Sequence, residues 1–222
     1  MNTVLVVAAH TDDEALGCGG TIARHVADGD NVFAVFMADG VSSRTGAGQS
    51  DLTSRNAAAE NAKKILGIRE NFYVGLPDNR LDTLPLIDVI QRLEPIIHQL
   101  RPSTIYTHHY GDLNIDHRIT HHAALTACRP MPGSTVREIF SFEVMSSSEW
   151  SAPSCEPFLP NHHVDISAYL AVKLEALNAY QVEMREAPHS RSMKHIESLA
   201  RHRGCVVGVE AAESFMTIRT IR

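Results

Sequence analysis

The feature that most constrains this fold is an apolar run near the N-terminus that ends in a cluster of polar side chains. Residues 4–7, Val-Leu-Val-Val, are aliphatic without polar alternation, which is typical of a strand buried on both faces of a parallel sheet. An imidazole and three carboxylates follow at once, at His10, Asp12, Asp13 and Glu14. Open α/β sheets bind ligands at the carboxyl ends of their strands, so this position suits a functional site.

A second polar cluster argues against a purely local explanation of the first. Alone, Asp13 could be a helix N-cap, with Glu14 placed at the positive end of the helix dipole. However, residues 107–118 again follow an apolar strand and close on Asp116-His117 before a helix. Two strand ends of one parallel sheet can meet in space, so we expect the two clusters to form one site.

The order of apolar segments predicts an α/β fold. Strands and helices alternate over the first half of the chain, with strands at 4–7, 31–38, 72–74 and 104–107 and helices at 13–28, 52–66 and 86–100. This alternation implies a Rossmann-like, mostly parallel sheet with helices on both faces. From residue 136 the pattern changes to a smaller C-terminal α+β portion, with strands at 164–166 and 214–221 and helices at 170–184 and 195–203. We expect residues 1–222 to form a single domain.

Composition narrows the class of ligand. The chain has 222 residues and a formal net charge of −6, which provides no broad attraction for nucleic acid or an anionic membrane. Thirteen histidines, several of them adjacent, favour metal binding or acid–base chemistry instead. No basic leader and no run long enough to span a bilayer are evident, so we expect a cytoplasmic protein with a small-molecule substrate. The sequence leaves a homo-oligomer open.

These motifs carry a family resemblance. The block Ala-His-Thr-Asp-Asp-Glu at residues 9–14 and the later Asp116-His117 pair resemble the PIG-L/LmbE family of zinc-dependent N-deacetylases in their order and separation. The resemblance spans most of the chain and extends to Arg55 with Glu60, to residues 111–118, and to residues 188–192, Pro-His-Ser-Arg-Ser. It implies an enzyme that removes an N-acyl group, with acetyl expected, from an amino sugar such as N-acetylglucosamine or from a sugar conjugate.

The resemblance also implies roles for residues. His10, Asp13 and His117 would hold zinc, and Asp12 would be the general base. Two imidazoles and one carboxylate are a normal catalytic zinc set, which leaves a position for water whose pKa the ion lowers to about 7. A carboxylate beside that water can take its proton during attack on the amide and deliver it to the departing amine. Because the set lacks cysteine, iron or cobalt could replace zinc.

The chain departs from the commoner family pattern at one place. Many members have His-Pro-Asp-His where this chain has Asn-Ile-Asp-His at residues 114–117. The missing imidazole is thought to polarise the carbonyl oxygen, whereas the Asn114 amide donates a hydrogen bond without charge. His189 is our first candidate for a substitute donor, and His109 near the substrate is the second. Asp116 is expected to fix the tautomer of a nearby histidine, with a helix cap as the alternative.

Arg55 is the expected substrate contact, because a guanidinium can hold sugar hydroxyls or a phosphate by paired hydrogen bonds. In that role its loss should leave stability nearly unchanged; the alternative is a surface salt bridge with Glu60. Trp150 and Phe158 could be core residues or a wall for sugar stacking, and we favour the core.

Two other functions remain open from the sequence. The same site could hydrolyse a different small amide, or the chain could be a zinc-bearing binding protein that does not catalyse. Asp12 discriminates between enzyme and binding protein, because a protein that only binds has no need of a base beside a full ligand set.

Overall fold

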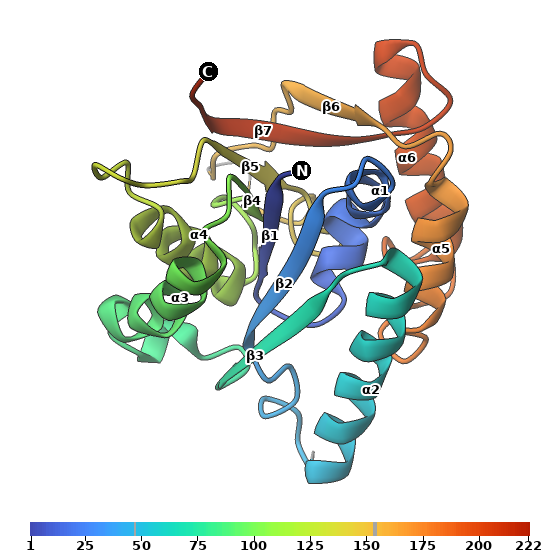
Figure 1. Ribbon diagram of the computed structural model, residues 1–222. Helices are drawn as coiled ribbons and strands as arrows, with labels where there is room; N and C mark the ends of the chain where they lie inside the picture. Colours follow the sequence, from blue (N-terminus) through green and yellow to red (C-terminus); the bar gives the residue numbers. More distant parts are fainter. Residues whose placement is uncertain (47, 153–154) are drawn as a thin grey trace.

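One sheet organises the computed structural model, which describes residues 1–46, 48–152 and 155–222 (Figure 1). Within these residues the sheet has seven strands in the order β3-β2-β1-β4-β5-β7-β6. The strands are β1 (Thr3–Ala8), β2 (Asn31–Ala38), β3 (Glu70–Leu76), β4 (Thr104–His108), β5 (Glu138–Phe142), β6 (His162–Asp165) and β7 (Ala212–Thr220). The helices are α1 (Asp13–Ala27), α2 (Gln49–Leu66), α3 (Leu86–Leu100), α4 (Ile115–Ala127), α5 (Leu170–Asn178) and α6 (Met193–Val207), with a short 3₁₀ helix, η1 (Leu81–Thr83).

The N-terminal strand β1 lies at the centre of the parallel part of the sheet, paired with β2 on one side and β4 on the other. Val4 and Val6 point into the core on one face of the sheet, and Leu5 and Val7 into the core on the other. All four side chains are fully buried. The absence of polar alternation in this run is therefore explained by burial on both faces, as predicted.

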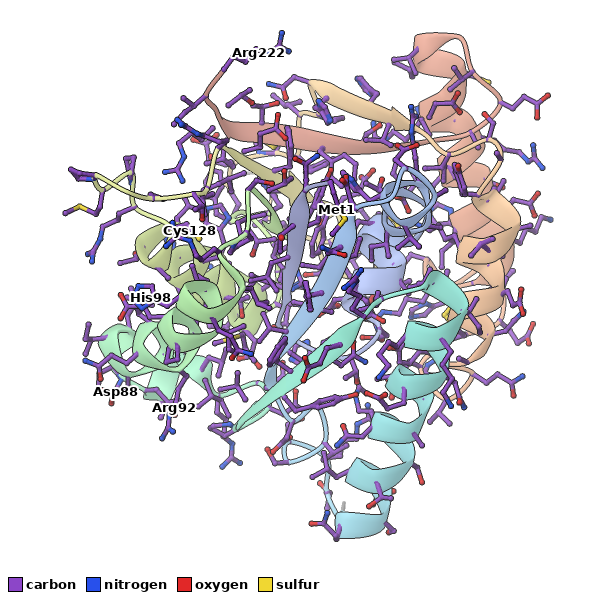
Figure 2. The ribbon with its side chains drawn as sticks, viewed as in Figure 1. Met1, Asp88, Arg92, His98, Cys128 and Arg222 are labelled. Atoms are coloured by element: carbon purple, nitrogen blue, oxygen red, sulfur yellow. The ribbon has the colours of Figure 1, made fainter. Side chains whose placement is uncertain are left out.

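Helices cover both faces of the sheet. In Figure 1, α3 and α4 lie on one side, and α1, α2, α5 and α6 on the other. Helix α3 continues through Pro95 and buries Val89 and Leu93 against the sheet. Its opposite side carries exposed charged residues, of which Asp88 and Arg92 point outward in Figure 2. This one-sided burial is what the helical spacing of apolar residues predicted.

The C-terminal half completes the same sheet. Strand β7 runs antiparallel to both β5 and β6, so the predicted C-terminal α+β portion adds an antiparallel edge to the parallel sheet. The helix predicted over 170–184 ends at Asn178, and the following residues form turns. The predicted α/β class with a mostly parallel sheet is confirmed.

The strand order places a topological switch point beside β1. The chain leaves β1 for α1 on one face of the sheet and leaves the neighbouring β4 for α4 on the other face. Where two adjacent parallel strands send their connections to opposite faces, the loops diverge and leave room for a ligand. The residues after β1 and β4 are those that carry the two polar clusters.

Small residues allow α1 to pack closely. A Cβ atom on Gly17 would overlap the ring of Phe142. A Cβ atom on Gly20 would lie only 2.7–2.8 Å from three side-chain atoms of Ile166, including its Cβ. Gly19 is different, because its nearest neighbour is the Lys173 Cγ atom at 3.3 Å. The glycines therefore serve helix packing immediately behind the site.

This packing predicts unequal effects of two neighbouring substitutions. Gly20→Ala should lower the free energy of unfolding by about 1 to 3 kcal/mol, because Ile166 cannot move away without disturbing the core. Gly19→Ala should change it by less than about 1 kcal/mol, since the Lys173 Cγ atom at 3.3 Å needs to shift only slightly and alanine favours the helix. Urea unfolding of both variants measures the difference. Equal destabilisation would contradict the packing role of Gly20.

Candidate metal centre and active site

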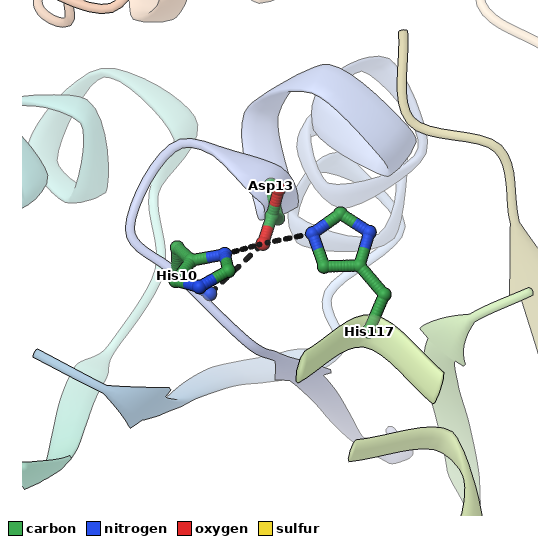
Figure 3. A group of neighbouring side chains, drawn as sticks. All are labelled: His10, Asp13 and His117. Carbon is green, nitrogen blue, oxygen red and sulfur yellow. Dashed lines mark hydrogen bonds and ion pairs between the residues drawn. The ribbon is translucent and has the colours of Figure 1, made fainter. Parts of the chain in front are cut away.

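The ends of β1 and β4 meet, as the two sequence clusters predicted. The backbone N–H of Ala9 donates to Nε2 of His108, at 2.8 Å, and fixes the two strand ends beside each other. His10 and Asp13 follow β1, and His117 lies in the first turn of α4. One potential ligand atom from each of these three residues falls within a cluster no wider than 4.8 Å (Figure 3).

Asp13 stands at the centre of this set. Its Oδ2 atom lies 3.3 Å from Nδ1 of His10 and 3.4 Å from Nε2 of His117. Figure 3 shows both imidazoles directed at this carboxylate from opposite sides. Asp13 is fully buried, and His10 and His117 are nearly so. The set is therefore shielded from bulk water, which strengthens its electrostatic interactions.

Carboxylates behind the two imidazoles orient them. Asp112 Oδ2 lies 2.9 Å from Nδ1 of His117. Asp116 Oδ2 and Asp78 Oδ1 each lie 3.1 Å from Nε2 of His10. Carboxylate partners of this kind hold a metal-binding imidazole in one tautomer and raise its basicity. They leave Nε2 of His117 and Nδ1 of His10 facing Asp13.

Unpartnered buried atoms show that a metal ion fits here. Within the described part of the chain, His117 Nε2 and Asp13 Oδ1 are buried and make no hydrogen bond. Such orphaned atoms are costly unless something binds them. Two imidazole nitrogens and one carboxylate are the ligands of a catalytic zinc site. His10, Asp13 and His117 are therefore suited to hold zinc or a similar divalent ion.

The charges around the set also favour a cation. Burial lowers the pKa of His117, but Asp13 and the hydrogen bond to Asp112 outweigh it and raise that pKa to about 9. Burial likewise lowers the pKa of His10. Its carboxylate partners Asp116, Asp13 and Asp78 outweigh this effect and hold that pKa well above the ordinary value. Burial works to raise the pKa of Asp13, yet His117 and His108 hold it well below its usual range. Because metal ligands must be deprotonated, a divalent ion would replace the protons that these carboxylates attract.

Two further groups of metal-capable side chains share residues with this set. One combines His108, Asp112 and His117, and the other combines His10, Asp78 and Asp116. In the first, His108 Nδ1 has no partner within the described segments, but Asp112 Oδ2 and His117 Nδ1 are already paired with each other at 2.9 Å. In the second, Asp116 already accepts the backbone N–H groups of Asn79 and Leu81, at 2.7 and 3.0 Å. The set around Asp13 has two atoms without a hydrogen-bond partner among the described residues, His117 Nε2 and Asp13 Oδ1.

Asp12 lies beside the metal set in an unusual backbone conformation. Its φ of 111° is in the left-handed region, which is strained for a residue with a side chain. The Glu14 carboxylate accepts its backbone N–H at 3.0 Å and helps to hold this turn. Burial raises the pKa of Asp12, while Arg191 and Arg55 oppose that shift. A nearly buried, basic carboxylate next to a ligand set has the position that a general base requires.

Arg55 is an internal anchor, which corrects part of the sequence expectation. It donates from Nε to Thr11 Oγ1 at 2.8 Å and from Nη2 to the Thr11 carbonyl at 2.7 Å. Its Nη1 atom pairs with Glu183, and Nη2 lies 3.4 Å from Asp12 Oδ1. Glu60 is bound to Lys63 and Tyr73 instead. The surface pair with Glu60 is therefore wrong. With these partners we expect Arg55 to contribute to stability, and its role as a substrate contact stays a prediction.

Two of the predicted polar residues, Asn114 and Asp116, lie at the start of α4. The Asn114 side chain accepts the Asp116 N–H at 2.8 Å, so Asn114 is the N-cap of this helix. Its amide nitrogen donates to Asn79 at 3.2 Å. Asp116 contacts His10 rather than capping the helix, as the tautomer-fixing role requires. The catalytic roles of both residues stay predictions.

The other two predicted histidines lie in different surroundings. His109 is buried, its Nε2 lies 2.9 Å from the Glu156 carbonyl, and its ring packs edge-on against Phe158. His189 is partly buried; its Nδ1 accepts the backbone N–H of Arg191 at 3.0 Å, and its ring meets Trp150 edge-on. Trp150 is 50% exposed, so the favoured core position is wrong for this residue. The roles of His109 and His189 remain predictions.

Three residues of the site were not identified as functional from the sequence. Asp78 follows β3, and the strand-end rule that selected His10 would have found it. Glu183 lies in the turns after α5 and binds both Arg44 and Arg55. Arg191 contacts Asp12 across 179 positions of sequence. The motif at 188–192 was recognised, but nothing local indicated which of its side chains faces the site.

No helix within the described ranges has both the length and the hydropathy needed to cross a membrane.

Comparison with known proteins identifies the family. The PIG-L family, described as GlcNAc-PI de-N-acetylase, matches residues 5–128. This chain belongs to the PIG-L family. The matched region includes the three metal-capable residues and Asp12, whereas the segment of Arg191 lies outside it. The resemblance inferred from the sequence is confirmed.

Curated relatives of this PIG-L member are deacetylases. The chain is 33% identical over 184 residues to the uncharacterized deacetylase YaiS of Escherichia coli K12, covering 80% of this chain and 90% of that protein. It is 29% identical over 202 residues to a probable N-acetyl-α-D-glucosaminyl L-malate deacetylase 2 of Bacillus cereus, covering 85% and 88%.

Solved structures share the fold at lower identity. N,N′-diacetylchitobiose deacetylase from Pyrococcus horikoshii superposes with a TM-score of 0.79 at 20% identity, over 98% of this chain and 84% of that one. GalB, a 4-carboxy-2-hydroxymuconate hydratase from Pseudomonas putida KT2440, superposes with a TM-score of 0.80 at 20% identity, over 100% and 98%. Because both reactions occur on this fold, the fold alone does not decide the chemistry.

The anchoring role of Arg55 predicts a stability effect. Arg55→Ala should lower the free energy of unfolding by about 3 to 5 kcal/mol, because Glu183 would be left in a buried position without its main partner. Arg92→Ala, on the exposed side of α3, is the matched control and should change stability by less than about 0.5 kcal/mol. Chemical denaturation measures both. An Arg55 variant as stable as the control would contradict the anchoring role and leave only the predicted substrate contact.

The metal set predicts the zinc content of two histidine variants. Wild-type protein loaded with zinc should retain about one ion per chain after dialysis. His117→Ala should lose it, while His98→Ala, which removes an exposed histidine from α3, should not. Elemental analysis of the folded variants decides the matter. Full occupancy in the His117 variant would rule out this ligand set.

Proposed function

We propose that this chain is a zinc-dependent N-deacetylase that removes an acetyl group from an amino sugar or a sugar conjugate, with residues 1–222 forming one deacetylase domain. The observation that carries the proposal is the position of Asp12. It is a nearly buried carboxylate next to the metal-capable set, and it is not itself a member of that set. We further propose that the enzyme works in the cytoplasm.

The chain's residues divide the reaction between them. His10, Asp13 and His117 would hold zinc, which when bound polarises a carbonyl and lowers the pKa of water. Asp12 accepts a proton from the attacking water and returns it to the nitrogen as the C–N bond breaks. Asp112 and Asp116 keep the two imidazoles oriented. The near-complete burial of these groups keeps bulk water away from the proton transfers.

The sugar-related substrate is supported by the relatives. The Bacillus cereus relative is named for an N-acetylglucosaminyl conjugate, and the Pyrococcus horikoshii enzyme for diacetylchitobiose. The half-exposed ring of Trp150 suits contact with the apolar face of a sugar, because tryptophan combines an apolar body with a polar edge. An acetamido sugar therefore fits the proposal better than an unrelated amide.

A binding protein without activity is the competing proposal. A direct assay separates the two: zinc-loaded protein is incubated with N-acetylglucosamine, N,N′-diacetylchitobiose and a panel of other N-acetyl sugars, and acetate and free amine are measured. Equal release of acetate and amine, abolished by a chelator and restored by zinc, is the expected result. Tight sugar binding without release would favour the binding protein.

Asp12→Asn tests the general base. The amide keeps the size of the carboxylate, and asparagine tolerates the left-handed conformation, so the fold and the zinc content should be preserved. The rate should fall by roughly 10² to 10⁴, because the amide cannot accept the proton. Asp13→Asn is the matched contrast and should weaken zinc binding instead. Near-native turnover of the Asp12 variant with zinc bound would place the base elsewhere.

A further inference from the structure

Deacetylation places negative charge on the carbonyl oxygen, and the family resemblance leads to the expectation of a histidine at position 114 to stabilise it. The replacement, Asn114, is occupied as a helix cap, and its amide nitrogen already donates to Asn79. Its neutral side chain also offers no charge to an oxyanion. The proposed mechanism therefore needs a donor from another part of the chain.

Arg191 is the cation that reaches the proposed general base from the solvent side. Its Nη1 atom donates to Asp12 Oδ2 at 2.9 Å. The Arg191 side chain is 20% exposed, whereas that of Asp12 is 1% exposed. Arg191 is therefore the solvent-accessible partner of this buried carboxylate, so its guanidinium is open to contact with a substrate.

The guanidinium of Arg191 is held in place by its other contacts. Its Nε atom donates to the Met145 carbonyl at 3.2 Å and to Ser146 Oγ at 2.6 Å. Its backbone N–H donates to His189 Nδ1 at 3.0 Å. These contacts fix the guanidinium before any substrate arrives, which is the preorganisation that stabilises charge effectively.

The second terminal nitrogen of Arg191 remains free for a ligand. Among the described residues Nη2 has no hydrogen-bond partner, while Nε and Nη1 are both engaged. Arg55, the other arginine at Asp12, uses Nε, Nη1 and Nη2 on Thr11, Glu183 and Asp12. Arg191 is thus the arginine at this site with donor capacity to spare.

We propose that Arg191 is a catalytic residue, whose guanidinium donates to the carbonyl oxygen of the acetyl group as negative charge develops there. The proposal rests on the deacetylase function proposed above. As water oxygen bonds to the carbonyl carbon, its proton passes to Asp12 and the carbonyl π electrons move onto the oxygen that Arg191 contacts. When the carbonyl re-forms, the C–N bond breaks and the proton on Asp12 passes to the nitrogen, giving acetate and a free amine.

This assignment gives His189 a different part from the one predicted by the sequence. His189 receives the Arg191 N–H on Nδ1, so it supports the turn that presents Arg191 and acts as a positioning residue. Its removal should therefore lower the rate less than the removal of Arg191. The reverse ranking would assign the oxyanion to His189 and overturn the proposal.

Kinetics of Arg191 variants provide the main test. With N,N′-diacetylchitobiose and zinc-loaded protein, Arg191→Ala should lower kcat by about 10² to 10³, the usual loss for one oxyanion donor, with little change in KM. Arg191→Lys should retain part of the rate. Added guanidinium, well below denaturing concentrations, should partly restore Arg191→Ala. Arg185→Lys, on the same segment with an exposed side chain that contacts only backbone carbonyls, is the matched control.

The alternative role for Arg191 gives a different kinetic pattern. If the guanidinium only bound an anionic group of the substrate, the Ala variant would raise KM and leave kcat unchanged, which would overturn the proposal. Unchanged kcat and KM would overturn it too. If the wild type releases acetate and Arg191→Ala is equally active, only this inference is refuted. If the wild type releases no acetate from any N-acetyl sugar of the panel, the proposed function is refuted and the role of Arg191 with it.

Acetate binding provides a readout that does not depend on turnover. Acetate carries the product oxygen that Arg191 is proposed to contact, so titration calorimetry with zinc-loaded protein should show about a tenfold or greater weakening in Arg191→Ala. Arg185→Lys should bind acetate like the wild type. An unchanged Kd for acetate in the Arg191 variant would show that this guanidinium does not face the acyl group.

Discussion

The contacts between the buried carboxylate of Asp13 and the surrounding imidazoles are the interactions on which the site depends. A fully buried negative charge is costly unless cations or hydrogen bonds surround it, and here His10, His108 and His117 supply the compensation from two different strand ends. The requirement to satisfy this carboxylate holds the β1 and β4 loops together. It also explains why an outer ring of carboxylates is present, because the imidazoles in turn need partners on their far sides.

The turn at Asp12 shows how the surrounding structure maintains a strained residue. A left-handed conformation at a non-glycine position costs of order 1 to 3 kcal/mol and persists only where other contacts enforce it. Arg55 from α2 and Arg191 from the segment before α6 form ion pairs with the two oxygens of the Asp12 carboxylate. The Glu14 carboxylate accepts the backbone N–H of Asp12. The C-terminal half of the chain is thus joined to chemistry that begins at the N-terminus.

The same architecture supports more than one reaction, so the fold alone does not decide the activity of this chain. A hydratase and a deacetylase both superpose on this chain with similar TM-scores. What favours deacetylation here is the combination of a ligand set with a separate carboxylate beside it. Because Asn114 is neutral and caps α4, the proposed mechanism takes its second positive charge from another part of the chain.

The sequence by itself determined the elements and the two halves of the metal site. The apolar run at 4–7 specified a strand buried on both faces, and the strand-end rule selected the two polar clusters, because both signals arise from local periodicity and from the geometry of parallel sheets. The family resemblance then pointed to His10, Asp13 and His117 within those clusters. The order and separation of the two clusters along the sequence indicated the family. The general position of the parallel strands and their covering helices followed from the same patterns.

Only the tertiary structure decided which distant side chains meet at this site. Arg55 proved to be an internal anchor, Trp150 proved to be half-exposed, and Arg191 proved to contact Asp12. The strands β6 and β7 of the predicted C-terminal portion joined the same sheet as an antiparallel edge. These outcomes depend on contacts between residues that lie far apart along the chain. Local residue patterns carry no record of such pairings, because they result from the packing of whole elements against one another.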